Sequence, residues 1–255
     1  MIFMKNKYLD LTVQMTLSEF RLRDQGTLLG FFWTLLHPLL LFLILNLLFI
    51  KWMGKFVEHY PLYLLVGIVQ WNFFASATSY SLSSLIRRAE LVKNFTFPRE
   101  IIVVSSVLTV FLSHLFELLI LTAFLLLSGA TFTPLFFLVP LIVLVQLILV
   151  ISISLPLSAL CVYYRDIERI WGLIVTAGFF LTPIFYSLSA ISEQRRLLLL
   201  LNPMTHIITA SRSCLIYNNA PNFSLLGIIL LLSLLILFIG FKIFRKMQRK
   251  FAEIL

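Results

Sequence analysis

Long stretches without any charged residue alternate with short charged segments along this chain. Residues 25–50 and 61–86 contain no Asp, Glu, Lys or Arg, and residues 101–164 contain only Glu117. About 20 helical residues are enough to cross a hydrocarbon core of about 30 Å. The uncharged stretches therefore predict an all-α integral membrane protein.

The pattern divides into six predicted transmembrane helices and a short interruption. Gly and Pro in the segment 128–134 divide the long stretch after residue 100 into two helices. Residues 197–211 are uncharged but too short for a span, and Asn202 and Pro203 interrupt them. Residues 193–217 are therefore predicted to form a re-entrant helix pair on the outer side. The six predicted spans are residues 28–50, 61–86, 101–127, 135–162, 170–188 and 225–241.

The first 27 residues have a mixed composition with helical periodicity. Leu9, Val13, Leu17 and Phe20 recur at spacings of three to four, and charged residues fall mostly elsewhere. This spacing predicts an amphipathic helix that lies in the membrane interface. Two interpretations stay open, a collar around a pore entrance and an ordinary juxtamembrane helix.

Lys and Arg residues are distributed unequally between the two sides of this predicted topology. Fifteen of the 20 lie in the N-terminal segment, in residues 87–100, in the loop 163–169 and in the tail after residue 241. Loops rich in Lys and Arg stay in the cytoplasm. We therefore expect both termini to be cytoplasmic, together with the charged segment 87–100. That segment lies between two spans and could receive force from a soluble partner.

Composition supports the membrane assignment and removes one alternative. The 255 residues are 60% hydrophobic and 12% charged, and the mean hydropathy is +1.02, whereas soluble domains carry about 25% charged residues. The net charge of +9 comes from basic residues at the ends of apolar runs. They build no continuous basic face, so nucleic-acid binding is not expected.

The sequence offers few groups for chemistry. It contains no P-loop, HExxH or GxSxG motif and no metal-binding spacing, so we expect neither an enzyme nor a bound metal or cofactor. His114 and Glu117 lie three residues apart on one face of the third predicted span. An intramembrane carboxylate is a candidate functional group, and a proton-coupled secondary carrier would use this pair. The alternative is a structural tie between helices.

A second competing function is a membrane-bound glycan-processing enzyme or an assembly scaffold. Such a protein should display polar catalytic groups in an outer loop. The candidates there, Glu193 and His206, make a poor constellation.

Aromatic residues gather in three of the uncharged stretches. Such residues commonly contact lipid or form the interfacial belt. They could alternatively form a wall along which sugar rings slide, because flat aromatic faces pack against the C–H faces of pyranoses. The candidate channel residues are Phe31, Phe32, Trp33, Trp71, Phe179, Phe180, Phe185 and Tyr186.

Four stretches together resemble the membrane subunits of bacterial ABC-2 type polysaccharide exporters, and they cover nearly the whole chain. They are RDQGTLLGFFWTLLHPLL (residues 23–40), LVKNFTFPREIIVVSSVL (91–108), YYRDIERI (163–170), and LTPIFYSLSAIS with LNPMTHIITASR between residues 181 and 212.

The resemblance implies a function and a set of partners. It implies a homodimer that encloses the transport path in the bacterial inner membrane, driven by two copies of a separate ATPase that bind ATP and Mg²⁺. The substrate would be a lipid-linked glycan, foremost O-antigen of lipopolysaccharide, with teichoic acid or capsular polysaccharide as alternatives. The first and fifth spans would line the channel.

The resemblance also implies roles for particular residues. Residues 87–100 resemble the coupling loop that docks on the ATPase, and residues 193–217 resemble the external re-entrant helices, with Asn202, Pro203 and Arg212 in the matching motif. Arg21 and Arg23 are candidates for attracting the lipid diphosphate. The coupling-loop candidates are Arg87, Arg88, Leu91, Val92, Lys93, Asn94, Phe95, Phe97, Pro98, Arg99 and Glu100.

Overall fold

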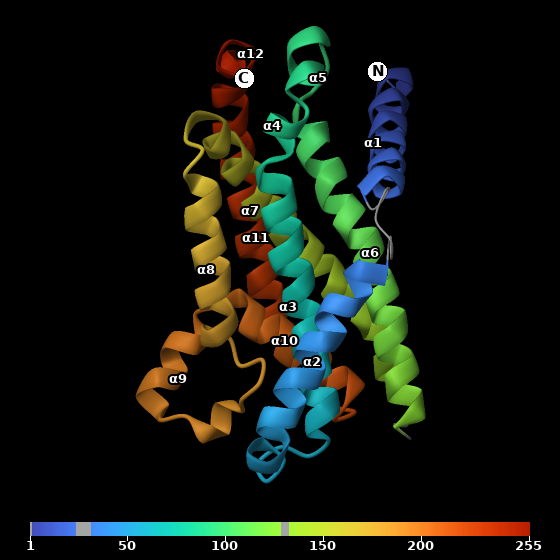
Figure 1. Ribbon diagram of the computed structural model, residues 1–255, viewed down its shortest axis with the longest axis vertical. Coiled ribbons are helices and arrows are strands. Elements are labelled where there is room, and N and C mark those ends of the chain that lie inside the picture. The colour runs from blue at the N-terminus through green and yellow to red at the C-terminus, as the bar shows by residue number, and fades with distance from the viewer. Residues whose placement is uncertain (1, 24–31, 129–132) are drawn as a thin grey trace.

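The computed structural model describes residues 2–23, 32–128 and 133–255. Within these ranges the secondary structure consists of helices and contains no strand (Figure 1). The predicted all-α class is therefore confirmed. Residues 24–27 of the predicted interfacial helix and residues 28–31 of the first span, including the channel candidate Phe31, lie outside the described residues.

Within the described ranges, five helices are long and apolar enough to cross a membrane, and they match five of the six predicted spans. A 3₁₀ helix, η1 (Pro134–Leu138), leads directly into the fourth of them. All five begin and end within a few residues of the uncharged stretches, except that the last continues into the basic tail. They are α2 (Phe32–Met53), α3 (Tyr60–Leu82), α6 (Glu100–Leu127), α7 (Val139–Tyr163) and α11 (Phe223–Met247).

Helix α8 (Ile167–Leu181) occupies the position of the fifth predicted span but has only 15 residues, fewer than the roughly 20 that a span requires. It ends at Leu181 and not at Leu188, because Thr182 precedes a proline. The residue before a proline is pushed out of the helical region, and Thr182 has extended angles, φ −94° and ψ 139°. A six-span count therefore stays a prediction.

Helix α3 forms the centre of the bundle. It contacts α2, α6, α7, α8 and α10 (Pro203–Leu215). Of the 18 consecutive residues that are most apolar in α3, 72% are buried, compared with 11% in α2. Helices α7 and α11 pack closely at Gly240, where a Cβ atom would lie 3.0 Å from Cδ of Pro156. The exposed apolar surface of α2 is left for lipid or for another chain.

Both termini and the short helix α5 (Ala89–Asn94) lie at the same end of the molecule (Figure 1). The charged segment 87–100, expected to be a loop, instead contains α5 and the last residue of α4 (Ser84–Arg87). The second predicted span, residues 61–86, ends early at Leu82, because the helix stops at Ser83 and the chain then forms these two short helices. Val92 of α5 is buried in a small apolar core with Phe244 and Phe251.

Helix α1 (Ile2–Arg23) packs along α6 in an orientation that the hydrophobic pattern did not anticipate. Leu9, Val13 and Leu17 are exposed, whereas Thr16 and Glu19 are buried against the bundle. Two polar residues of this helix therefore contact protein, and three of its four periodic apolar residues stay exposed, where lipid can cover them.

The segment predicted to be re-entrant, residues 193–217, forms two helices, α9 (Glu193–Leu200) and α10 (Pro203–Leu215), after a short 3₁₀ turn, η2 (Leu188–Ala190). The Asn202 side chain accepts a hydrogen bond from the backbone N–H of Met204 at 3.0 Å and so caps α10. Pro203 follows at the first helical position, where its missing N–H costs nothing. Helix α10 packs against α3, α7 and α11.

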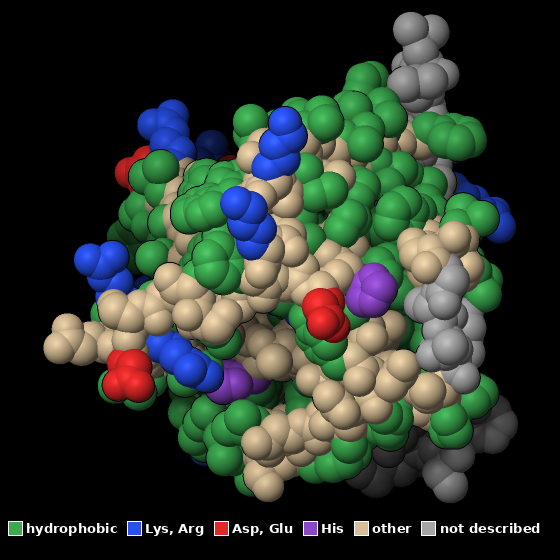
Figure 2. Space-filling model, turned by 90° about the horizontal axis from the view of Figure 1, so that it is seen from below, with side chains coloured by type: hydrophobic (Ala, Val, Ile, Leu, Met, Phe, Trp, Pro, Cys, Tyr) green, Lys and Arg blue, Asp and Glu red, His purple; other side chains and the backbone are tan. Residues whose placement is uncertain are grey.

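The basic tail is helical beyond the predicted end of the last span, Phe241. Lys242 lies 4.2 Å from the Phe238 ring centroid, and Arg245 lies 4.4 Å from that of Phe241. The ammonium and the guanidinium therefore lie over the ring faces, as in cation–π contacts. After α11 the chain continues through η3 (Gln248–Lys250) and α12 (Phe251–Ile254). The opposite end of the molecule carries scattered charged groups on a surface of hydrophobic side chains, uncharged polar side chains and backbone (Figure 2).

Candidate functional site

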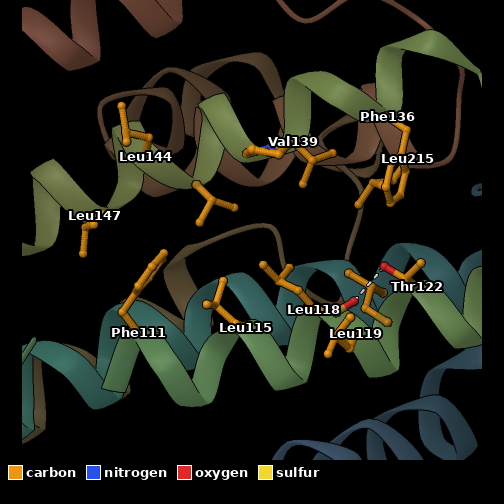
Figure 3. Close-up of a pocket in the computed structure, with 13 residues that line it drawn as sticks. Phe111, Leu115, Leu118, Leu119, Thr122, Phe136, Val139, Leu144, Leu147 and Leu215 are labelled. Atoms are coloured by element: carbon orange, nitrogen blue, oxygen red, sulfur yellow. Dashed lines mark hydrogen bonds between the residues drawn. The ribbon is translucent and has the colours of Figure 1, made fainter. Parts of the chain in front are cut away.

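Two cavities of similar volume differ completely in chemistry. The first, of about 450 Å³, is an apolar groove between α6 and the segment formed by η1 and α7 (Figure 3). Thr122 supplies a hydroxyl to this groove, but it donates to the Leu118 carbonyl at 2.8 Å. Nothing polar is left there to orient a ligand, so the groove suits hydrocarbon.

The second cavity, which we call the polar cavity, has a volume of about 480 Å³. Helices α2, α3 and α6 form its walls, and α1, α4 and α8 each contribute a charged residue. Hydroxyl, amide, imidazole, carboxylate and guanidinium groups all face it, which makes it the candidate binding site. It is lined by Arg23, Thr34, His37, Asn72, Phe73, Ser76, Ser79, Tyr80, Ser83, Arg87, Val110, Ser113, His114, Glu117 and Glu168.

His114 and Glu117 lie at the inner wall of the polar cavity, 1% and 4% exposed. His114 Nδ1 is 3.6 Å from Glu117 Oε2, and Asn72 donates to Glu117 Oε1 at 2.7 Å. The ring of Phe73 stacks on His114 with centroids 4.5 Å apart. Both imidazole nitrogens and Glu117 Oε2 lack a hydrogen-bond partner among the described residues. The predicted pair therefore meets, and Asn72 is a third member that spacing alone did not indicate.

The two candidate headgroup residues, Arg21 and Arg23, point to different sides of helix α1. Arg23 reaches into the polar cavity and donates to Ser113 Oγ at 2.7 Å and to Thr34 Oγ1 at 3.1 Å. Arg21 is exposed and does not line the cavity, because residues two apart point to different sides of a helix. Of the pair, Arg23 is the one placed to meet a ligand in the cavity.

The candidate aromatic residues form one cluster and one separate group. Trp71 meets Phe179 edge-on at 6.4 Å, and Phe185 lies 6.1 Å from both Phe179 and Phe180 and 5.0 Å from Tyr186. Phe49 of α2 joins this cluster at 5.2 Å from Phe185. The sequence pattern does not point to Phe49, since a single Phe in a long apolar helix carries no signal.

Phe32 and Trp33 are not part of that aromatic cluster. They lie on α2 and are 70% and 51% exposed.

Gly178 of α8 allows the aromatic cluster to form, because a Cβ atom there would lie 2.8 Å from the Trp71 ring. A larger residue at this position would push the indole out of its place between α3 and α8.

Arg212 of the re-entrant helix α10 is a buried structural clamp, 2% exposed. Its guanidinium donates to the backbone carbonyls of Tyr63 at 3.0 Å, Pro183 at 2.7 Å and Ile184 at 2.8 Å. It also lies 3.3 Å from the centroid of the Tyr63 ring. Burial lowers the pKa of Arg212, and the nearby Tyr63 counters this by raising it. One side chain thus ties α10 to α3 and to the chain after α8.

Further polar contacts hold the extended segment 182–186 in place. The Tyr60 and Tyr63 hydroxyls donate to the carbonyls of Phe185 at 2.9 Å and Tyr186 at 3.0 Å. The Asn202 amide donates to Thr182 Oγ1 at 2.8 Å. Phe185 and Tyr186, the members of the aromatic cluster that follow the end of α8, are therefore held in place through their backbone carbonyls.

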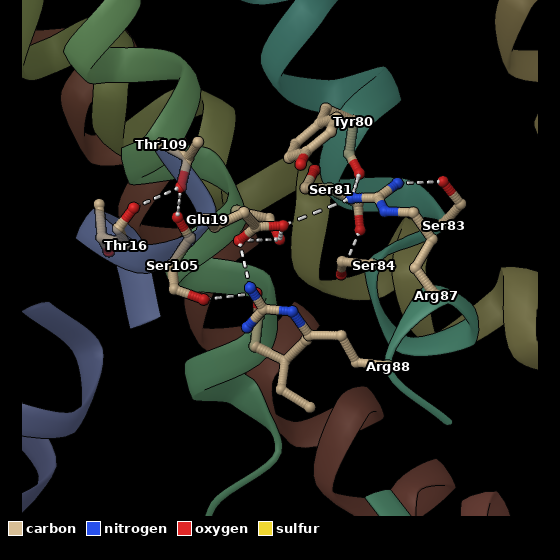
Figure 4. A network of polar contacts seen from close by, with 12 residues as sticks. Thr16, Glu19, Tyr80, Ser81, Ser83, Ser84, Arg87, Arg88, Ser105 and Thr109 are labelled. Carbon is tan, nitrogen blue, oxygen red and sulfur yellow. Dashed lines mark hydrogen bonds and ion pairs between the residues drawn. The ribbon is translucent and has the colours of Figure 1, made fainter. Parts of the chain in front are cut away.

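Glu19 of α1 is the centre of an ion-pair network with the charged segment (Figure 4). Its carboxylate lies 2.9 Å from Arg88 and 3.8 Å from Arg87, and it accepts from Ser106 Oγ of α6 at 3.2 Å. Arg87 also lies over the Tyr80 ring, 4.0 Å from the centroid. The interfacial helix and the start of the charged segment are therefore connected by side chains.

The end of the charged segment is tied to the C-terminal tail. Arg99 donates to the backbone carbonyl of Gln248, Arg245 lies 3.6 Å from Glu100, and Phe97 packs against the small core that contains Val92. Most of the eleven coupling candidates thus have partners within the chain. Lys93, Asn94 and Phe95 are exposed at the end of α5, where Asn94 donates to Glu90 of the same helix at 3.2 Å and Phe95 is 60% exposed.

Comparison with known proteins gives consistent matches along the chain. Residues 11–216 match the family described as ABC-2 type transporter. An O-antigen export system permease protein RfbA of Klebsiella pneumoniae is 31% identical over 247 residues, 96% of this chain and 95% of the relative. A protein of the same name from Myxococcus xanthus is 29% identical over 249 residues, 97% of this chain and 96% of the relative.

Proposed function

This chain belongs to the ABC-2 type transporter family, and from that membership we propose that it is the membrane subunit of an ATP-driven polysaccharide exporter. The proposed substrate is lipid-linked O-antigen, which moves from the cytoplasm across the inner membrane. The observation that carries this proposal is the match to O-antigen export permeases over nearly the full length of both chains. The long apolar helices give the chain its multi-pass membrane character.

A separate ATPase would supply the energy, bound at the end of the molecule that carries α5. The chain itself contains no P-loop sequence for ATP. An exposed aromatic residue flanked by polar ones is typical of a protein interface, and Phe95 beside Lys93 and Asn94 has this character. Two copies of this chain with two ATPase subunits would form the working complex.

The transport path would run along α3 between α2 and α8. The polar cavity lies on this side of α3 and the aromatic cluster lies farther along it. Hydroxyl and amide groups suit the diphosphate and sugar entry, and flat rings suit sliding of the sugar chain. A second copy facing α2 and α8 would close the path, which accounts for the large apolar surface exposed on α2.

We expect Phe95→Ala to weaken the complex with the ATPase subunit by about tenfold or more, because truncating an aromatic anchor costs about 2 kcal/mol at a protein interface. The measurement is the affinity of the purified ATPase for the permease in nanodiscs, together with O-antigen at the cell surface. Phe137→Ala is the matched control, since Phe137 is 83% exposed but lies in η1. Export by this chain in cells that lack the ATPase would contradict the proposed function.

A further inference from the structure

The polar cavity presents more hydrogen-bonding groups than the passage of a lipid headgroup requires. We propose that it is a recognition site for the sugar unit nearest the lipid diphosphate, with Glu117, His114 and Asn72 as its specificity-determining residues. This inference rests on the function proposed above and adds a selectivity to it. The exporter would distinguish glycans by the first sugar and not only by the lipid.

The first argument is that buried groups lack partners. Glu117 is 96% buried, and Asn72 satisfies only its Oε1 atom, at 2.7 Å. Glu117 Oε2 and both nitrogens of the His114 ring have no hydrogen bond among the described residues. A buried polar atom without a partner is costly. These atoms line the polar cavity, so a ligand with hydroxyl or amide groups could satisfy them there.

The second argument is that the chemistry of the lining suits a sugar better than an ion. The lining combines two guanidiniums with two carboxylates, so neither sign of charge dominates. No group of three or more His, Cys, Asp and Glu side chains with metal-binding geometry occurs in the ranges that the structure describes. Neutral donors and acceptors make up most of the rest, and a polyhydroxyl ligand needs both.

The third argument is size and position. A volume of about 480 Å³ falls in the range of about 300–1,000 Å³ that is typical of small-molecule sites. Glu168 of α8 and Thr34 of α2 belong to the same lining. The cavity therefore lies between the two helices that flank the proposed path, where a glycan would pass.

The fourth argument is that phosphate-binding groups lie in the same cavity. Arg23 and Arg87 both line it, and guanidinium groups suit phosphate oxygens. Arg23 donates to Ser113 Oγ at 2.7 Å, and Ser113 is the residue before His114. A diphosphate held near Arg23 would therefore place the first sugar close to the imidazole and carboxylate.

The test is equilibrium binding to the permease in nanodiscs without its ATPase. The probes are N-acetylglucosaminyl-diphosphoryl-undecaprenol and undecaprenyl diphosphate, which share the lipid and the diphosphate; the second lacks the sugar and has one further ionisable phosphate oxygen. We expect the sugar-bearing lipid to bind at least about tenfold tighter, as one hydrogen bond to a charged group provides. In Glu117→Gln and His114→Gln this ratio should fall to near one, while the Kd for undecaprenyl diphosphate stays unchanged.

Thr122→Val is the matched control, because Thr122 lies on the same helix as Glu117 but faces the apolar groove. It should keep the tenfold ratio. Equal binding of both lipids to the unmodified protein would overturn the inference and leave the proposed function standing. The same conclusion would follow if the variants weakened binding of both lipids equally while the melting temperature stayed unchanged. If neither lipid bound better than phosphatidylglycerol, the proposed function would fail as well.

Discussion

Arg212→Leu should destabilise the re-entrant unit more than any other substitution considered for this chain. Leucine removes three hydrogen bonds to buried carbonyls, and those of Pro183 and Ile184 lie outside any helix that could supply another donor, whereas Tyr63 lies within α3. Each unsatisfied buried group costs about 1–3 kcal/mol, and we expect a total loss of about 3 kcal/mol or more. The melting temperature in detergent should fall, and protease should cut more readily within residues 182–186, which are buried or partly buried in the unmodified protein.

Two further variants separate the geometry of this clamp from its charge. Arg212→Lys keeps the charge but cannot reach three carbonyls with a planar fork, so it should recover only part of the stability. Gly67→Ala should destabilise without touching the arginine itself, because its Cβ would lie 2.6 Å from Arg212 Nη2. Stability equal to that of the unmodified protein in Arg212→Leu would show that the contacts contribute nothing.

Glu19→Leu should uncouple ATP hydrolysis from export. The carboxylate joins α1 to Arg88 at 2.9 Å and to Arg87 at 3.8 Å, and it is buried while the two guanidiniums are partly exposed. Removing one member of a buried ion pair leaves charges without a partner and costs about 3–5 kcal/mol, less here because solvent screens both arginines. Export should fall at least tenfold while the ATPase rate of the complex is kept.

A charge exchange gives the decisive control for this ion pair. Glu19→Arg combined with Arg88→Glu should restore export in part, whereas each single change should not. Asp10→Leu on the same helix is the matched control, since Asp10 is exposed, and it should export normally. Export and ATPase rate would be read together in proteoliposomes. Loss of both activities in Glu19→Leu, with a lowered melting temperature, would mean that the residue only supports folding.

The hydrophobic pattern predicted most helices, because a membrane span must make all its backbone hydrogen bonds within itself and carries few charged residues. Helix α6 begins and ends within a residue of the predicted 101–127 span. The pattern failed where a local rule competed with it. Apolar residues continue to Leu188, but Thr182 before a proline ends α8 at Leu181. The short helices inside the charged segment were not predicted, because a charged composition suggests a loop but does not exclude a helix of one or two turns.

The candidate site was predicted only in part: His114, Glu117 and Arg23 were singled out from the sequence, whereas Asn72 was not. Helical spacing was enough to bring His114 near Glu117, whereas Asn72 comes from α3 and Arg23 from α1. Glu19 and its partners Arg87 and Arg88 are distant in sequence, and no periodicity connects such residues. Arg212 bonds only to backbone carbonyls, which are present at every position and therefore give no signal in sequence.

The packing of α5 on the C-terminal tail imposes an order on biosynthesis. Val92 shares its apolar core with Phe244 and Phe251, and Arg99 bonds to the carbonyl of Gln248. The ribosome makes Val92 and Arg99 long before these partners. Helix α5 therefore reaches its final position only after α11 has inserted and the tail has returned to it. The surface proposed for the ATPase is completed late, so nascent chains that are still inserting would not recruit the ATPase.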